Sequence, residues 1–208
     1  MLIGGVNSVY GQARDISSGG TPTITGALSG SVTGSSSVLN NLAVTINFGE
    51  VSPANANSIV KVTVPIAVRS RNGYRVRVSA TSSTGADVLA VQRTDIGFGV
   101  RNMRPMGADS QVCTRNSHIF ATPFNNDPST SVSINAAGRA TYPSTLNNIG
   151  TNTLILSGPR LSATANADRQ TDNGYIFDAI VVITPQFFAS GATSATLTFT
   201  ISAQSIAC

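Results

Sequence analysis

The sequence has little of what catalytic and metal-binding sites are usually built from. Among 208 residues there is no tryptophan, one histidine, one glutamate and two cysteines. A Ser-His-Asp triad would have to use His118, whose neighbours carry no nucleophile-elbow pattern. The sequence also lacks paired carboxylates for glycoside hydrolysis and the ligand spacings of zinc or calcium sites. We therefore predict a protein that is not an enzyme and that holds no metal or cofactor.

Charge is scarce as well. Charged residues make up 11% of the chain, compared with roughly 25% in typical soluble domains. The formal net charge is +4, but the arginines are scattered, and the densest group, at 69–77, has no aromatic platform beside it. Nucleic-acid binders concentrate positive charge in a patch or stripe, so we expect no nucleic-acid partner. Uncharged polar surfaces suit secreted proteins, shell proteins and subunits buried in an assembly.

Long apolar runs are missing too. No stretch approaches the about 18 apolar residues of a transmembrane helix, so we expect no membrane insertion. Residues 1–7 have neither a basic region nor a long apolar core, and they do not form an intact signal peptide. If the protein is exported, we expect that peptide to be missing from this chain.

The two cysteines, Cys113 and Cys208, are far apart in the sequence. With the lone histidine they supply too few ligands for a metal site. In an oxidising compartment they could form a disulfide that closes a loop of about 95 residues and contributes on the order of 4 kcal/mol. Two free thiols are the alternative.

Apolar and polar residues alternate over much of the chain, with the period of a half-buried strand. The clearest runs are 42–48, 62–68, 74–80 and 197–203, and residues 175–184 form a more uniformly apolar run. The sequence contains no amphipathic helix of any length and no internal repeat. These features predict an all-β fold, an antiparallel immunoglobulin-like or jelly-roll β-sandwich with an N-terminal extension.

Residues 71–73, Arg-Asn-Gly, join two of these runs. A three-residue hairpin loop would pair Val68 with Val76 and place the apolar residues of both strands on one face. We therefore predict a hairpin here. It places Arg69 opposite Arg75, so we expect an anion or solvent to relieve their repulsion.

Residues 1–37 differ from the rest because Gly/Ser-rich pieces flank a short apolar segment, 23–32. In an extended strand Ile24, Leu28 and Val32 lie on one face, with glycines between them. Glycine weakens an isolated strand but permits close backbone approach, so this segment needs a sheet edge, in its own subunit or in a neighbour. An ordinary first strand of the same sandwich is the alternative.

The middle of the chain, 101–148, is rich in loops and proline, which often marks a functional surface or an interface. Phe120, Phe124 and Tyr142 lie there and give some support to a lectin-like site. Asp178 interrupts an apolar run, and we expect it to face outward or to accept from a nearby arginine.

Residues 44–53, Val-Thr-Ile-Asn-Phe-Gly-Glu-Val-Ser-Pro, run from an apolar strand into Phe-Gly-x-Val-x-Pro. This pattern resembles the early strand of bacterial pilin domains assembled by donor-strand exchange, the chaperone–usher pilins and their spore-coat-U-like branch. Residues 191–201 resemble the final strand of such domains. The resemblance covers roughly residues 42–80 and 175–204.

The resemblance implies an incomplete immunoglobulin-like sandwich, 38–208, that the N-terminal extension of a neighbouring subunit completes. The predicted function is that of a structural subunit in an extracellular, cell-surface filament such as a pilus or fimbrium, with identical subunits as partners. Residues 23–32 would be the donor strand, anchored by Ile24, Leu28 and Val32, whose burial contributes roughly 5 to 8 kcal/mol. The alternatives are an adhesin or lectin-like module that binds surface glycans and a viral jelly-roll shell protein.

Overall fold

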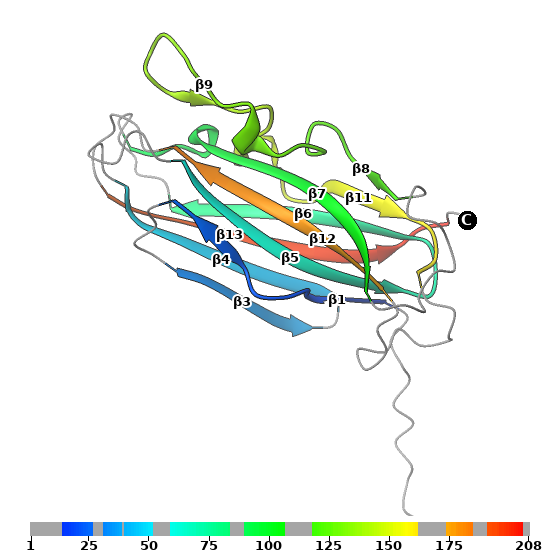
Figure 1. The fold of residues 1–208 in the computed structure, drawn as a ribbon. Coiled ribbons are helices and arrows are strands. Elements are labelled where there is room, and N and C mark those ends of the chain that lie inside the picture. The colour runs from blue at the N-terminus through cyan, green and yellow to red at the C-terminus, as the bar shows by residue number, and fades with distance from the viewer. Residues whose placement is uncertain are drawn as a thin grey trace, which may run out of the picture.

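The computed structural model describes residues 14–26, 31–38, 40–51, 59–83, 90–106, 118–161, 174–184 and 191–205. Within these ranges the protein is all-β, with antiparallel strands in two sheets that pack as a sandwich (Figure 1). The fold class predicted from the alternation of apolar residues is therefore confirmed. None of the helices in these ranges is long and apolar enough to cross a membrane.

Sheet A has the strand order β1–β5–β12–β7, and β2 pairs with β5 as well. Its strands are β1 Arg14–Ser18, β2 Thr23–Thr25, β5 Val60–Ser70, β7 Ile96–Met106 and β12 Gly174–Ile183. Sheet B has the order β3–β4–β13–β6–β11–β8. Its strands are β3 Ser31–Val38, β4 Asn41–Val51, β6 Tyr74–Ser83, β8 Ile119–Phe120, β11 Thr153–Gly158 and β13 Gly191–Ala203. The remaining elements are a small ribbon, β9 Ser133–Ile134 with β10 Ala140–Thr141, and the 3-10 turns η2 Arg93–Asp95, η4 Pro128–Thr130 and η5 Leu146–Asn148.

The hydrophobic core lies between the two sheets. Each long strand sends alternate apolar side chains inward, as the period-two pattern requires. The largest fully buried side chains include Tyr74, Phe98, Tyr175, Phe177 and Phe199. Burying one such side chain contributes roughly 1.5 to 3 kcal/mol, so this core supplies most of the stabilisation of the sandwich.

Residues 71–73 do not close a hairpin. Strand β5 lies in sheet A beside β12, whereas β6 lies in sheet B between β13 and β11. The prediction was wrong because burial specifies only which face is apolar, and two strands facing each other across a core satisfy it as well as two paired strands do. In consequence Arg69 lies opposite Asp15 of β1 and not opposite Arg75.

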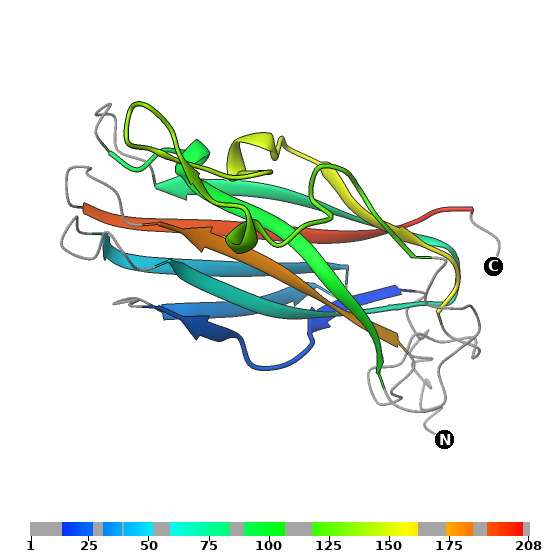
Figure 2. The same ribbon diagram turned by 45° about the horizontal axis from the view of Figure 1, so that its top comes forward.

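A third layer, residues 122–150, lies against the outer face and the β7 edge of sheet A. Gly97 and Gly99 permit this contact. A Cβ atom at Gly97 would lie 2.9 Å from the side chain of Pro128, and one at Gly99 would overlap the backbone carbonyl of Asn126. Figures 1 and 2 show this segment and the N-terminal strands on opposite sides of the sandwich.

Candidate assembly site at the N-terminal edge

Strands β1, β2 and β3 together form what we call the N-terminal edge of the sandwich. Strands β1 and β2 pair with β5 in sheet A, whereas β3 pairs with β4 in sheet B. Residues 23–32 are therefore not the single extended strand that their sequence predicts. The chain turns at Gly26, where φ is +91° and an added Cβ would overlap the carbonyl oxygen of Ile59. The first part of the predicted segment joins one sheet and its last residues join the other.

The three predicted anchors have different environments. Val32 of β3 is half-buried and packs against the core. Ile24 of β2 is 42% exposed, and Leu28 lies outside the described residues. Their role as donor anchors stays a prediction, as does the division of the chain after residue 37, although β3 runs across that position.

Ile16 of β1 is the fully buried anchor of this edge, and sequence reasoning missed it. Its side chain is 0% exposed and lies opposite Val68 in the register of β1 with β5. Strand β1 also packs across the sandwich against β4 and β13. The only sequence signal was one isoleucine between polar neighbours, and a single alternation is too short to predict a strand.

A buried ion pair joins β1 to the body of the sandwich. Nη1 of Arg69 lies 3.1 Å from Oδ2 of Asp15, and these side chains are 7% and 1% exposed. Arg69 Nη1 also donates to Oγ of Ser17 at 3.2 Å, and Ser17 Oγ donates to Asp15 Oδ2 at 3.2 Å. A buried charge is tolerated only when it is paired and hydrogen-bonded, so this triad fixes β1 on β5.

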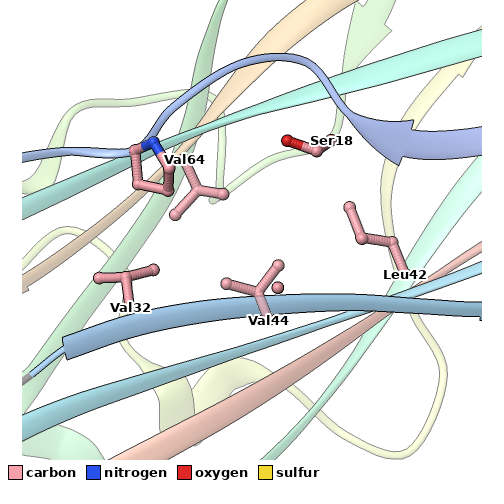
Figure 3. A pocket seen from close by; sticks show the side chains of 7 residues that line it. Ser18, Val32, Leu42, Val44 and Val64 are labelled. Carbon is pink, nitrogen blue, oxygen red and sulfur yellow. The ribbon is translucent and has the colours of Figure 1, made fainter.

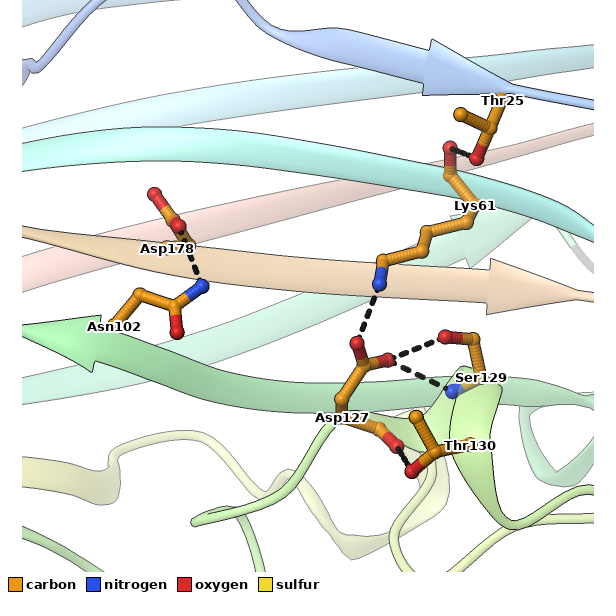
Figure 4. Close-up of polar contacts among 7 residues, drawn as sticks. All are labelled: Thr25, Lys61, Asn102, Asp127, Ser129, Thr130 and Asp178. Carbon is orange, nitrogen blue, oxygen red and sulfur yellow. Dashed lines mark hydrogen bonds and ion pairs between the residues drawn. The ribbon is translucent and has the colours of Figure 1, made fainter.

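Strand β2 is held less firmly than β1. All three of its residues are exposed, and Oγ1 of Thr25 donates to the carbonyl of Lys61 at 3.4 Å (Figure 4). Between the two short strands β5 carries Pro65, which has no N–H, and Gly19 donates its N–H to the Pro65 carbonyl at 2.9 Å. Pro65 therefore interrupts the ladder, and β1 and β2 are separate attachments.

A cavity of about 140 Å³ lies inside the N-terminal edge (Figure 3). Its lining comes from the β1–β2 segment and from β3, β4 and β5, and consists of Ser18, Pro22, Val32, Gly34, Leu42, Val44 and Val64. Protein interiors contain few voids larger than a water molecule, because close packing maximises dispersion contacts. The side chains that line this cavity therefore lack close neighbours on the side that faces it.

Lys61 and Asp127 connect the start of β5 to the third layer (Figure 4). Asp127 caps η4 by accepting from the N–H and the Oγ of Ser129, at 2.9 and 2.6 Å. Burial alone would raise the pKa of Asp127, but hydrogen bonds from Lys61 and Ser129 outweigh it and the pKa is lowered. This carboxylate is therefore a structural link between the layers.

Asp178, in the middle of β12, has an arginine partner, which is one of the two alternatives that the sequence leaves open. Nη1 of Arg104 lies 2.9 Å from its Oδ1. Nδ2 of Asn102 donates to its Oδ2 at 3.0 Å, as Figure 4 shows. Both partners lie on β7, the neighbouring strand. The group therefore fastens two strands of sheet A together.

His118 packs into an aromatic cluster rather than lying on the surface. Its Nδ1 is 2.9 Å from the hydroxyl of Tyr74, and its ring centroid is 4.7 Å from that of Tyr175. Burial lowers the pKa of His118 to about 4 and raises that of Tyr74, so both groups are neutral near pH 7. Because the Tyr74 hydroxyl occupies Nδ1, we assign His118 a packing role.

The aromatic residues of the middle segment do not form an exposed platform. Phe124 is 2% exposed, Phe120 packs against the core, and the hydroxyl of Tyr142 donates to Oγ1 of Thr184 at 2.9 Å. Cys113 and Cys208, the predicted disulfide partners, lie outside the described residues. Within the described ranges no group of three or more His, Cys, Asp or Glu residues could hold a metal ion.

Comparison with protein-family models, curated proteins and solved structures gives no match for this chain. What the N-terminal edge can do must therefore be judged from its own contacts.

Proposed function

We propose that the protein is a non-enzymatic structural subunit of an extracellular, pilus-like filament. Each subunit donates an N-terminal strand to a neighbouring subunit of the same kind. This proposal rests on the N-terminal edge. There an early segment of the chain covers one side of a hydrophobic core that later strands form.

The contacts of this edge can be exchanged between copies. Among the described strands of sheet A, β5 is the one to which β1 and β2 are hydrogen-bonded, so their departure breaks no ladder between the other strands of that sheet. A second copy of the same segment offers the same backbone groups and the same Ile16 to the vacated edge. Strand addition of this kind combines main-chain hydrogen bonds with anchor side chains in pockets.

Strand β1 is the best candidate for the exchanged strand, together with β2. Strand β3 is paired to β4 as a hairpin, with Val38 opposite Asn41, so its removal would open that hairpin. The β1–β2 segment is not joined to β4 by such a hairpin, and it lines the cavity described above. The donor therefore lies N-terminal to most of the segment 23–32.

Symmetry explains why such exchange gives a filament. The donor strands and the acceptor edge of one subunit are different surfaces, so each copy both gives and receives. A head-to-tail contact whose rotation does not close a ring produces an open polymer. Because the same contacts form within one copy at high dilution, assembly is favoured by concentration.

The test is deletion of residues 1–26, which removes β1 and β2 and leaves the β3–β4 hairpin intact. We expect the truncated protein to form no filaments under electron microscopy, because β5 has no strand to accept. Addition of a peptide spanning residues 14–26 should give stable single subunits that still do not polymerise. Filaments of native appearance from the truncated chain would overturn the proposal.

A further inference from the structure

The guanidinium of Arg69 depends on β1 for its partners. Within the described part of the chain, the hydrogen bonds of its Nη1 go to Asp15 and Ser17, both on β1, and its Nε is buried without a partner. With β1 in place the side chain of Arg69 is 7% exposed, and the carboxylate of Asp15 is its ion-pair partner there. Removing one member of a buried ion pair is strongly destabilising, because the remaining charge is uncompensated.

The same pair fixes the register of β1. In the observed register Asp15 lies opposite Arg69 and Ile16 lies opposite Val68. A shift by one residue would bring either Arg14 or Ile16 opposite Arg69, and it would turn the apolar side chain away from the core. Like charges directly across a ladder are unfavourable. The shift that brings Arg14 opposite Arg69 is therefore disfavoured by charge repulsion as well as by the loss of the buried isoleucine.

We propose that Arg69 is the recognition residue by which each subunit selects β1 of a neighbouring copy, through the carboxylate of Asp15. This inference rests on the proposed exchange of the N-terminal strands. It assigns the selection to a charge and not to the apolar residues of 23–32. The partner is thus a second copy of this chain whose incoming strand carries a carboxylate one residue before its buried isoleucine.

A reciprocal charge exchange tests this assignment on the full chain. The Asp15→Arg and Arg69→Asp variants are each refolded alone and then together at equal concentration, and filaments are counted by electron microscopy. Alone, each variant would pair like charges at every junction, and we expect the number of filaments to fall roughly tenfold. In the mixture every junction between unlike chains joins opposite charges, so filaments containing both chains should return.

Two controls show that the effect belongs to this pair. The double variant Asp15→Arg/Arg69→Asp should assemble alone, and its assembly would show that a chain with both substitutions can fold. The matched pair Asp178→Arg and Arg104→Asp changes an ion pair that lies wholly within the body of sheet A. Mixing those two variants should restore no filaments, because this ion pair forms within one chain and a second chain cannot supply the missing partner.

A milder variant covers the case in which the charge reversals do not fold. Chains with Asp15→Asn keep the size of the side chain but lose its charge. Refolded with an equal amount of native chain, they should be depleted as strand donors in the filaments. Equal incorporation of both donors would overturn the recognition role of Arg69.

A separate measurement distinguishes failure of this inference from failure of the proposed function. Ser17 lies opposite Ala67 in the register of β1 with β5. When Ser17→Cys chains are mixed with Ala67→Cys chains, a disulfide between those two positions can form only if β1 has moved between copies. If that disulfide forms but the charge exchange restores no filaments, the recognition role is lost and strand exchange stands. If it does not form, both are lost.

Discussion

The two edges of sheet A are closed in different ways. At β7 the N–H groups of Phe98 and Val100 donate to the carbonyls of Ser144 and Phe124, at 3.0 and 2.7 Å. At the opposite edge β5 is covered by the short strands β1 and β2. The segment that closes β7 is inserted between two body strands, whereas the one that closes β5 precedes the body. Only the second can move to a neighbour without opening the rest of the fold.

Polar contacts reinforce the difference. Beside the β7 edge the guanidinium of Arg93 donates to the carbonyls of Ala80, Leu146 and Ile149, at 3.0, 2.7 and 2.7 Å. These bonds tie η5 and the third layer to both sheets. At the N-terminal edge the buried polar link is the group around Arg69, and a cavity lies beside the strands. We therefore expect the β7 edge to be permanent and the N-terminal edge to be exchangeable.

The largest expected effect comes from opening the β7 edge with Gly99→Val. A Cβ atom at Gly99 would overlap the carbonyl of Asn126 and lie 3.0 Å from Cδ of Pro128. The third layer must then move away, and we expect the free energy of unfolding to fall by about 3 to 5 kcal/mol. The midpoint of urea unfolding measures this loss.

The matched control is Gly34→Val, in β3 at the N-terminal edge. A Cβ atom there would meet nothing within 4 Å, and valine suits an exposed strand. We expect a change of less than about 0.5 kcal/mol. If both substitutions destabilised the protein equally, the contrast between a sealed edge and an open one would be wrong.

Alternation along the chain was enough to predict the long strands but not their partners. The runs at 42–48, 74–80 and 197–203 became β4, β6 and β13, and 175–184 became the central strand β12. Sheet membership could not be predicted in the same way, because each strand shows only its own apolar face. The loop at 71–73 fits a hairpin and a sheet-to-sheet connection equally well.

The candidate site was harder to predict than the fold. Residues 23–32 have a regular apolar face, but the left-handed conformation at Gly26 divides them between two sheets. The group that holds the edge, Asp15 with Arg69, joins residues 54 positions apart. Nothing local in the sequence marks such a pair, because its partners meet only when the whole sandwich has formed.

An intermediate effect is expected from Ile16→Ala, which removes the buried anchor of β1. Loss of a fully buried isoleucine side chain costs about 2 to 4 kcal/mol. Here we expect the loss to appear first as detachment of β1, measured by faster hydrogen exchange of the β1 amides. Ile24→Ala, at a position that is 42% exposed, should leave exchange and stability nearly unchanged. Equal effects of the two substitutions would contradict the placement of the anchor in β1.

The smallest expected effect is a dependence of stability on pH that comes from His118. Burial lowers the pKa of His118 from 6.5 to about 4, so between these values the unfolded chain binds a proton that the folded chain does not. Stability should therefore be full above about pH 6.5, fall as the pH drops and level off below about pH 4. Because the ring is only half-buried, we expect a loss of about 1 to 2 kcal/mol.

The variant His118→Asn separates this term from the titration of the carboxylates. Asparagine keeps an acceptor for the hydroxyl of Tyr74 but has no proton to gain, so the variant should lose less stability than the native chain between pH 7 and pH 4.5. Urea unfolding at the two pH values measures the difference. Equal losses in the two proteins would contradict the assignment of this pH dependence to His118.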